Sequence, residues 1–160
     1  MSFDVEYQGF GYGGIGVSTD ISLFGDLTFE DMGKKACREV MPDMEDSTKT
    51  ALRASVKHSG ESNLVNSVKC FEPAMTKDGE GVKLVCQPCG RDSRSNHYTS
   101  KSHGKMRSHL VHNNDKAFWL EYGVAGRQAA HPWQSRAINS ANAKVYPKIQ
   151  QSIEKQLGAE

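Results

Sequence analysis

The chain has 160 residues, 37% of them hydrophobic, which is enough for one domain with its own core. Its 20 basic and 19 acidic residues give a net charge of +1, which excludes bulk attraction to DNA or anionic membranes. No apolar run approaches the ~18 residues that span a bilayer, and MSFDVEYQGF lacks the basic start of a signal peptide. We therefore expect no membrane partner, a cytosolic origin, and four cysteines that remain thiols.

Residues 1–27 are rich in glycine and are predicted to be a flexible arm. Five glycines between positions 9 and 16 are interleaved with Phe10, Tyr12 and Ile15. Ordering so many glycines is costly, so these apolar groups are expected to become ordered only against a neighbour. The glycines match G-x-G-x-x-G, but no apolar strand precedes them and no helix directly follows, so no cofactor site is predicted.

From Thr28 the pattern is typical of a long amphipathic helix. Thr28 and Asp31 suit the first turn. Pro42 predicts a kink, or two abutting helices, near Val40 to Met41. The residues expected to face the core recur at three- and four-residue spacing: Phe29, Met32, Ala36, Val40, Met44, Thr48, Leu52 and Val56.

The period changes between residues 64 and 112. Alternation over Val65–Phe71 and the run Val82–Cys86 predict two strands of a β-hairpin, joined by the turn Thr76–Gly81. The polar loop 90–104 follows and precedes a weakly alternating segment, Met106–His112. We expect this loop to project from the body, because excursions of this length usually serve contact.

The last stretch contains an apolar segment, Ala117–Gly123, then Pro132-Trp133 and a final helix in which Pro147 predicts a bend. The stripe of that helix is Ala137, Ala141, Val145, Ile149, Ile153 and Leu157. The predicted fold is a single α+β domain over residues 28–160, with long N-terminal and C-terminal helices packed on a small antiparallel β-sheet.

One set of residues has the spacing of a zinc site. Cys86 and Cys89 are followed by His103 and His109 within the Cys-x2-Cys, His-x3-5-His pattern. A short zinc module also needs apolar residues between its ligand pairs, and residues 90–102 offer only Tyr98. A loop without metal is therefore the preferred interpretation, and a zinc-dependent nucleic-acid-binding module is an alternative.

The same region carries a local basic charge. Between Arg91 and His112 there are five basic residues, one acid and four histidines. We expect them to contact either an acidic partner or, transiently, genomic DNA, and this contact should be sensitive to salt. The basic residues are Arg91, Arg94, Lys101, Lys105 and Arg107.

No constellation in the sequence indicates an enzyme. There is no glycine-flanked serine elbow, and Glu121, the acid in the most apolar company, has no paired carboxylate. A structural or interface role is therefore predicted for Glu121, and a hydrolase that uses it is an alternative. Aromatic residues beside glycine and proline turns suggest a contact surface. The residues predicted to lie at or just beneath an interface are Phe10, Tyr12, Phe118, Trp119, Glu121, Tyr122, Pro132 and Trp133.

Two segments carry a resemblance to a known family. Lys116–Gly123, a short linker, then His131–Ala137 and a C-terminal helix show an aromatic-x-x-Glu-aromatic-Gly turn and a Pro-aromatic pair. Upstream, Ala51–Gly60 through Leu64–Lys69 looks like a helix that ends in a Thr-Gly-x-Leu-x-x-Ser-Ile-like junction. Together these segments resemble the tail-completion (head-to-tail joining, minor tail component) family of long-tailed bacteriophages.

The resemblance implies a non-enzymatic virion protein that forms a homo-oligomeric ring, expected to be a hexamer. The ring would lie at the head-proximal end of the tail or in the neck and would join the tail tube to head-completion proteins. It would be found in the virion, and in the host cytoplasm during assembly. A tail-terminator ring is an alternative of the same class.

Overall fold

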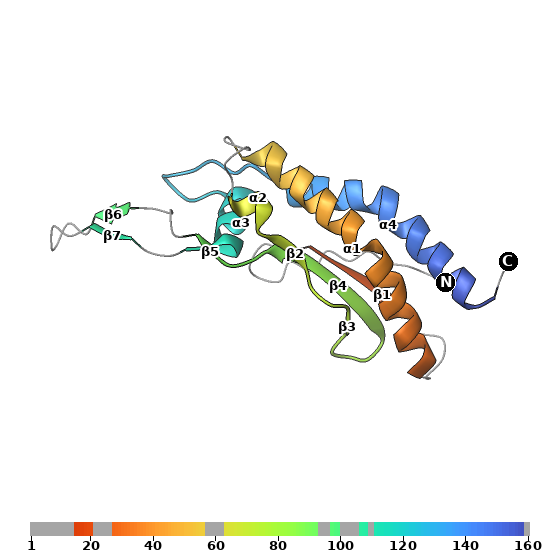
Figure 1. The fold of residues 1–160 in the computed structure, drawn as a ribbon. Coiled ribbons are helices and arrows are strands. Elements are labelled where there is room, and N and C mark those ends of the chain that lie inside the picture. Colours follow the sequence, from red (N-terminus) through yellow and green to blue (C-terminus); the bar gives the residue numbers. More distant parts are fainter. Residues whose placement is uncertain are drawn as a thin grey trace.

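The computed structural model describes residues 15–20, 27–56, 63–92, 97–99, 106–108 and 111–158. Helices α1 (Leu27–Ser55) and α4 (Gln134–Gln156) pack side by side on a small antiparallel sheet (Figure 1). This α+β arrangement confirms the fold class predicted from the sequence. The two remaining helices, α2 (Asn63–Asn66) and α3 (Asn113–Tyr122), are short and lie at one end of the body (Figure 1).

Helix α1 is one continuous element that runs through Pro42. Its inward face is formed by residues of the predicted stripe, including Ala36, Val40, Met44 and Leu52. Pro42 lies on the exposed side, where water can bind the carbonyl group that a proline leaves without an amide partner. The alternative of two abutting helices is therefore wrong.

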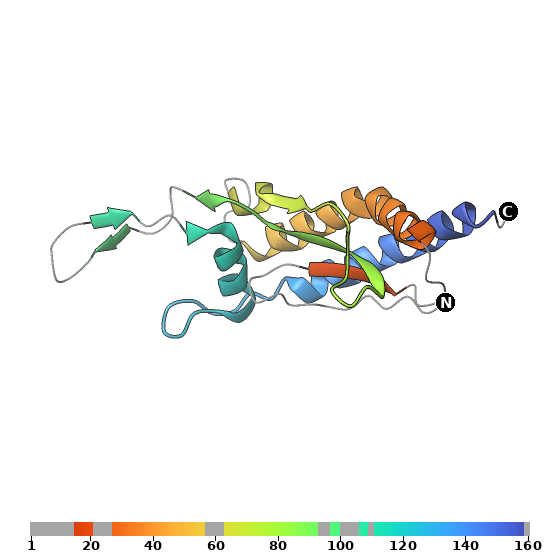
Figure 2. The same cartoon turned by 90° about the horizontal axis from the view of Figure 1, so that it is seen from below.

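The sheet has β4 (Gly81–Pro88) at its centre, flanked by β1 (Ile15–Asp20) and β2 (Val68–Cys70). The short β3 (Ala74–Met75) also pairs with β4. Even-numbered residues of β4 are buried and odd-numbered ones from Lys83 on are partly exposed. Helices α1 and α4 lie on the same face of the sheet, and no helix covers the opposite face in either view of the described elements (Figures 1 and 2).

Two predictions for this region need correction. Residues 1–27 were expected to contain no regular element, yet β1 lies within them and pairs with β4 along its whole length. The body of the domain therefore begins by residue 15. Val65 was expected in a strand but lies in α2, because Leu64, Val65 and Val68 all reach the core at a helix-to-strand junction. Phe10 and Tyr12 lie outside the described residues.

The predicted hairpin turn between β3 and β4 is confirmed. The Thr76 side chain accepts a hydrogen bond from the backbone of Gly81 at 3.0 Å, and Gly79 adopts a positive φ of 77°. The Thr76 hydroxyl and the backbone N–H of Glu80 lower the pKa of Asp78 by hydrogen bonding to its carboxylate.

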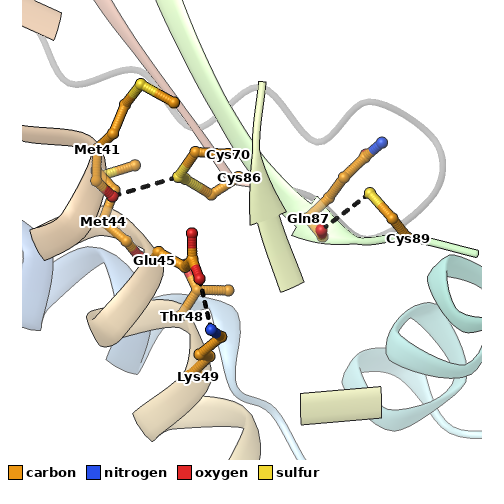
Figure 3. Close-up of a disulfide and its surroundings, with 9 residues drawn as sticks. All are labelled: Met41, Met44, Glu45, Thr48, Lys49, Cys70, Cys86, Gln87 and Cys89. Atoms are coloured by element: carbon orange, nitrogen blue, oxygen red, sulfur yellow. Dashed lines mark hydrogen bonds and ion pairs between the residues drawn. A yellow bond between two sulfur atoms is a disulfide. The ribbon is translucent and has the colours of Figure 1, made fainter. Parts of the chain in front are cut away.

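Two of the cysteines lie directly opposite each other in the sheet. Cys70 of β2 pairs in register with Cys86 of β4, their Cα atoms are 3.9 Å apart, and the structure joins them in a disulfide (Figure 3). The Cys70 sulfur lies 3.4 Å from the carbonyl oxygen of Met41 on α1. The expectation of four thiols is therefore wrong for this pair, because strand register brings together residues that are 16 apart in sequence.

The polar region after β4 forms a projecting arm. Strand β5 (Arg91–Asp92) pairs with β8 (Val111–His112) near the body, and β6 (His97–Thr99) pairs with β7 (Met106–Ser108) farther out. Both views place β6 and β7 beyond the end of the body (Figures 1 and 2). The predicted projection is thus seen for β6 and β7. From here on, the arm means strands β5 to β8, and not the glycine-rich residues 1–27.

Candidate functional site

The segments that carry the family resemblance meet where α3 leads into α4. The carboxylate of Glu121, on α3, accepts hydrogen bonds from the backbone N–H groups of Trp133 at 2.7 Å and Gln134 at 3.0 Å. These groups lie at the N-terminus of α4, where amides have no partner within the helix and the helix dipole favours a negative charge. Glu121 therefore fixes the start of α4, although it lies 12 residues before Trp133.

Trp133 packs between α3 and the start of α4. Its side chain is fully buried, and its indole N–H donates to the carbonyl oxygen of Ala117 at 3.0 Å. A buried indole that has its hydrogen-bond partner belongs to the core of the subunit. Trp133 therefore cannot contact a partner directly in this structure, and its place just beneath an interface stays a prediction.

Gly123 ends α3 and lets the chain turn back. Its φ is 76°, and its N–H donates to the carbonyl oxygen of Trp119 at 2.8 Å. A Cβ at this position would lie 2.8 Å from the carbonyl oxygen of Gln128. Val124 and Gln128 pair with each other by backbone hydrogen bonds, so the linker closes against Gly123. Glycine is needed here for its conformation and for the space that it leaves.

The opposite face of α3 carries two exposed aromatic side chains. Phe118 and Tyr122 are 36% and 57% exposed, and their ring centroids are 4.7 Å apart. They stand one helical turn apart, as residues at i and i+4 do. Of the other predicted interface residues, Trp119 and Glu121 are partly buried and Pro132 is exposed. We call Phe118 and Tyr122 the aromatic pair.

Arg136 ties the start of α4 to the end of α1. Its guanidinium donates to the hydroxyl of Ser55 at 2.6 Å and to the carbonyl oxygen of Pro132. Ser55 is itself buried and donates to the carbonyl oxygen of Ala51. The turn between α3 and α4 is therefore fixed to α1 as well, and we call Glu121, Gly123, Trp133 and Arg136 the corner.

The arm is anchored by a residue that sequence reasoning missed. Asn113, 4% exposed, donates from its side chain to the carbonyl oxygen of Cys89 at 2.8 Å, and its backbone N–H donates to Gly90. These bonds hold the chain entering β5 against the first residue of α3. The only sequence signal was an asparagine beside the predicted strand Met106–His112, a position that is common at helix N-termini.

The basic residues of the arm are only partly placed. Arg91 is exposed, and its Nε donates to Nε2 of His112, its directly opposite partner in β8, at 3.1 Å. Arg107 belongs to β7. Arg94, Lys101 and Lys105 lie outside the described residues.

The described residues include only the two cysteines of the zinc pattern. Cys86 is fully buried and bonded to Cys70, so it cannot serve as a thiolate ligand. Cys89 lies past the end of β4 with its sulfur toward the carbonyl oxygen of Gln87 (Figure 3), and burial raises the pKa of its thiol. His103 and His109 lie outside the described residues, and within the described ones no group of three His, Cys, Asp or Glu residues is arranged to hold a metal ion.

Comparison of the chain with protein-family models, with curated proteins and with solved structures gives no match. Among the helices in the described part of the chain, none is both long and apolar enough to cross a membrane.

Proposed function

We propose that this chain is a structural protein of a bacteriophage virion. Copies of it form a ring, a hexamer by the family resemblance, at the head-proximal end of the tail or in the neck. The ring joins the tail tube to the head-completion proteins. The proposal rests on the resemblance of Lys116–Gly123 and His131–Ala137 to the tail-completion family.

The corner is the observation that carries the proposal. Three distinctive residues of these two segments have a physical task in one small structure: Glu121 fixes the start of α4, Gly123 makes room for the linker, and Trp133 is buried against α3. Short motifs recur by chance, but chance matches have no reason to pack against each other. Their joint packing therefore supports the view that the two segments form one motif.

The exposed features suit a protein that works by contact. The aromatic pair is exposed on α3, and the arm projects beyond the body (Figure 1). Exposed aromatic side chains are common anchors in protein interfaces. Projecting loops usually serve recognition.

The tail-terminator ring is a second proposal of the same class, and a genetic experiment separates the two. If the protein is a completion protein, cells infected with a phage that lacks it should accumulate heads and finished tails of normal length that fail to join. Loss of a terminator should instead give tails of abnormal length.

The direct test is the mass and location of the protein. Native mass spectrometry of the purified chain should give a closed oligomer, and antibody labelling of virions should mark the head-proximal end of the tail. A protein that stays monomeric at all concentrations and is absent from virions would overturn the proposal.

A further inference from the structure

The sulfur of Cys70 lies within reach of two different partners. It is bonded to the sulfur of Cys86 on β4, and it also lies 3.4 Å from the carbonyl oxygen of Met41 on α1 (Figure 3). A thiol S–H at that distance is a weak hydrogen-bond donor to the carbonyl oxygen. The fold therefore accommodates the Cys70 sulfur both as half of a disulfide and as a thiol.

The pairing of β2 with β4 does not depend on the covalent bond. All three residues of β2 are in antiparallel register with β4. Val68 and Cys86 belong to the buried core, and the backbone N–H of Phe71 donates to the carbonyl oxygen of Val85 at 2.8 Å. These contacts are available to the reduced chain as well, so reduction should leave the fold in place.

The bond acts on a segment that is otherwise held by few ladder positions. It joins residues 16 apart in sequence and so encloses β3, which has two residues, and the turn before β4. Segments with so few backbone hydrogen bonds open locally at a low free energy. A cross-link between β2 and β4 prevents the strands from separating there and limits the conformations of the opened chain. We call Val68–Met75 the β2–β3 segment.

The β2–β3 segment presents side chains at the surface. Phe71 is 46% exposed, and the exposed carboxylate of Glu72 pairs with Arg38 on α1. A bond that keeps the segment closed therefore also keeps these two groups in one arrangement.

We propose that Cys70 and Cys86 form a reversible redox lock on the β2–β3 segment. The oxidant is a small disulfide of the glutathione class. Two protein thiols and one oxidised glutathione give the Cys70–Cys86 disulfide and two reduced glutathione molecules. The S–S bond of glutathione breaks, the protein S–S bond forms, and the two thiol protons pass to the glutathione sulfurs.

The structure corresponds to the locked state. A reducing cytoplasm keeps the lock open during synthesis, and oxidising surroundings outside the cell close it. This timing rests on the proposed function, because a virion leaves the cytoplasm. The lock itself is a property of the single chain and does not depend on a ring.

Redox titration of the purified full chain tests the lock. One sample is equilibrated with reduced glutathione in large excess, as in cytosol, and another with mostly oxidised glutathione. Alkylation under denaturing conditions and peptide mass mapping should show free Cys70 and Cys86 in the first sample and their disulfide in the second. Hydrogen exchange of residues 68–75 should be at least about tenfold slower in the oxidised sample.

Two serine variants provide the matched control. Cys70→Ser cannot form the bond, so its β2–β3 segment should exchange at the rate of the reduced chain in both buffers. Cys89→Ser removes a cysteine that is outside the disulfide, and it should respond to the buffers as the original chain does. Far-UV circular dichroism checks the fold of each variant, and the titration of the original chain decides the matter if Cys70→Ser does not fold.

Several results would overturn the lock. They are free Cys70 and Cys86 thiols in the oxidised buffer, a disulfide that survives the reducing buffer, and equal exchange of residues 68–75 in the two states. A disulfide that contains Cys89 in place of either partner would overturn it too.

The timing is tested separately, by alkylating the protein in infected cells and in released virions. We expect thiols in the cells and the disulfide in the virions. Thiols that persist in released virions overturn the timing and leave the proposed function intact. If the protein is absent from virions, the proposed function and the timing both fail, while the titration still decides the lock.

Discussion

The two faces of α3 differ in what they contact, although the residues of both faces belong to the same ten-residue helix. The inner face presents Ala117, Leu120 and Glu121 to Trp133 and the start of α4. The outer face presents the aromatic pair, Phe118 and Tyr122, to the surface. One short segment therefore fixes the fold on one side and offers a contact surface on the other. The aromatic character of a residue alone does not reveal which side it serves.

The largest difference between the faces should appear on truncation of Trp133. Trp133→Ala should lower the free energy of unfolding by about 3–5 kcal/mol, because it leaves a large cavity and removes the hydrogen bond from the indole N–H to the carbonyl oxygen of Ala117. Urea denaturation of the unassembled chain measures this. Trp133→Phe keeps most of the volume and loses the N–H donor, so it should cost less. A stable Trp133→Ala variant that only fails to assemble would show that the residue is an interface anchor after all.

The linker between α3 and α4 should show the next largest loss of stability on substitution. Gly123→Ala should cost about 2–3 kcal/mol, because the residue combines a positive φ with a Cβ that would overlap the carbonyl of Gln128. Gly126 has a similar φ of 70° but open space around it, so Gly126→Ala should cost only about 1 kcal/mol. Thermal unfolding compares the two variants. Equal losses would mean that the close approach at Gly123 has no energetic weight.

Loss of the carboxylate tests the inner face of α3 itself. Glu121→Ala removes the acceptor for two backbone N–H groups and should cost about 1–2 kcal/mol. Glu121→Gln keeps one carbonyl oxygen and should lose about half as much. The measurement is denaturant unfolding. If Glu121→Ala left stability unchanged but abolished assembly, Glu121 would belong functionally to the outer face.

The smallest effect on stability is expected on the outer face. Phe118→Ala with Tyr122→Ala should change the free energy of unfolding by less than about 1 kcal/mol, because both side chains are already exposed. If the pair anchors a subunit contact, the concentration for half-assembly should rise at least about tenfold. Sedimentation velocity measures assembly. Normal assembly of this variant would remove the aromatic pair from the interface.

Periodicity predicted the two long helices well. The stripes over α1 and α4 appear as buried faces, from Ala36 to Leu52 and from Ala137 to Ile153. These faces repeat every three or four residues over many turns, so a single misplaced residue does not obscure them. The turn at Asp78-Gly79 was predicted for a local reason too, because it needs a residue that accepts a positive φ.

Helix α3 was not predicted, and neither was β1. Both faces of α3 carry apolar or aromatic residues, so it shows little amphipathic pattern in sequence. Strand β1 lies next to a glycine-rich segment and owes its form to pairing with β4, a segment more than 60 residues later. Short elements of this kind depend on tertiary pairing, which local patterns do not contain.

For the candidate site, the sequence by itself determined which segments matter: Lys116–Gly123, His131–Ala137 and the basic region around Arg91 and Arg107. Only the tertiary structure decided that Trp133 is buried, that Glu121 accepts from the start of α4, and that Cys86 is bonded to Cys70. The physical reason is that burial, hydrogen-bond partners and strand register depend on residues distant in sequence, whereas composition, charge and helical periodicity are local properties of the chain.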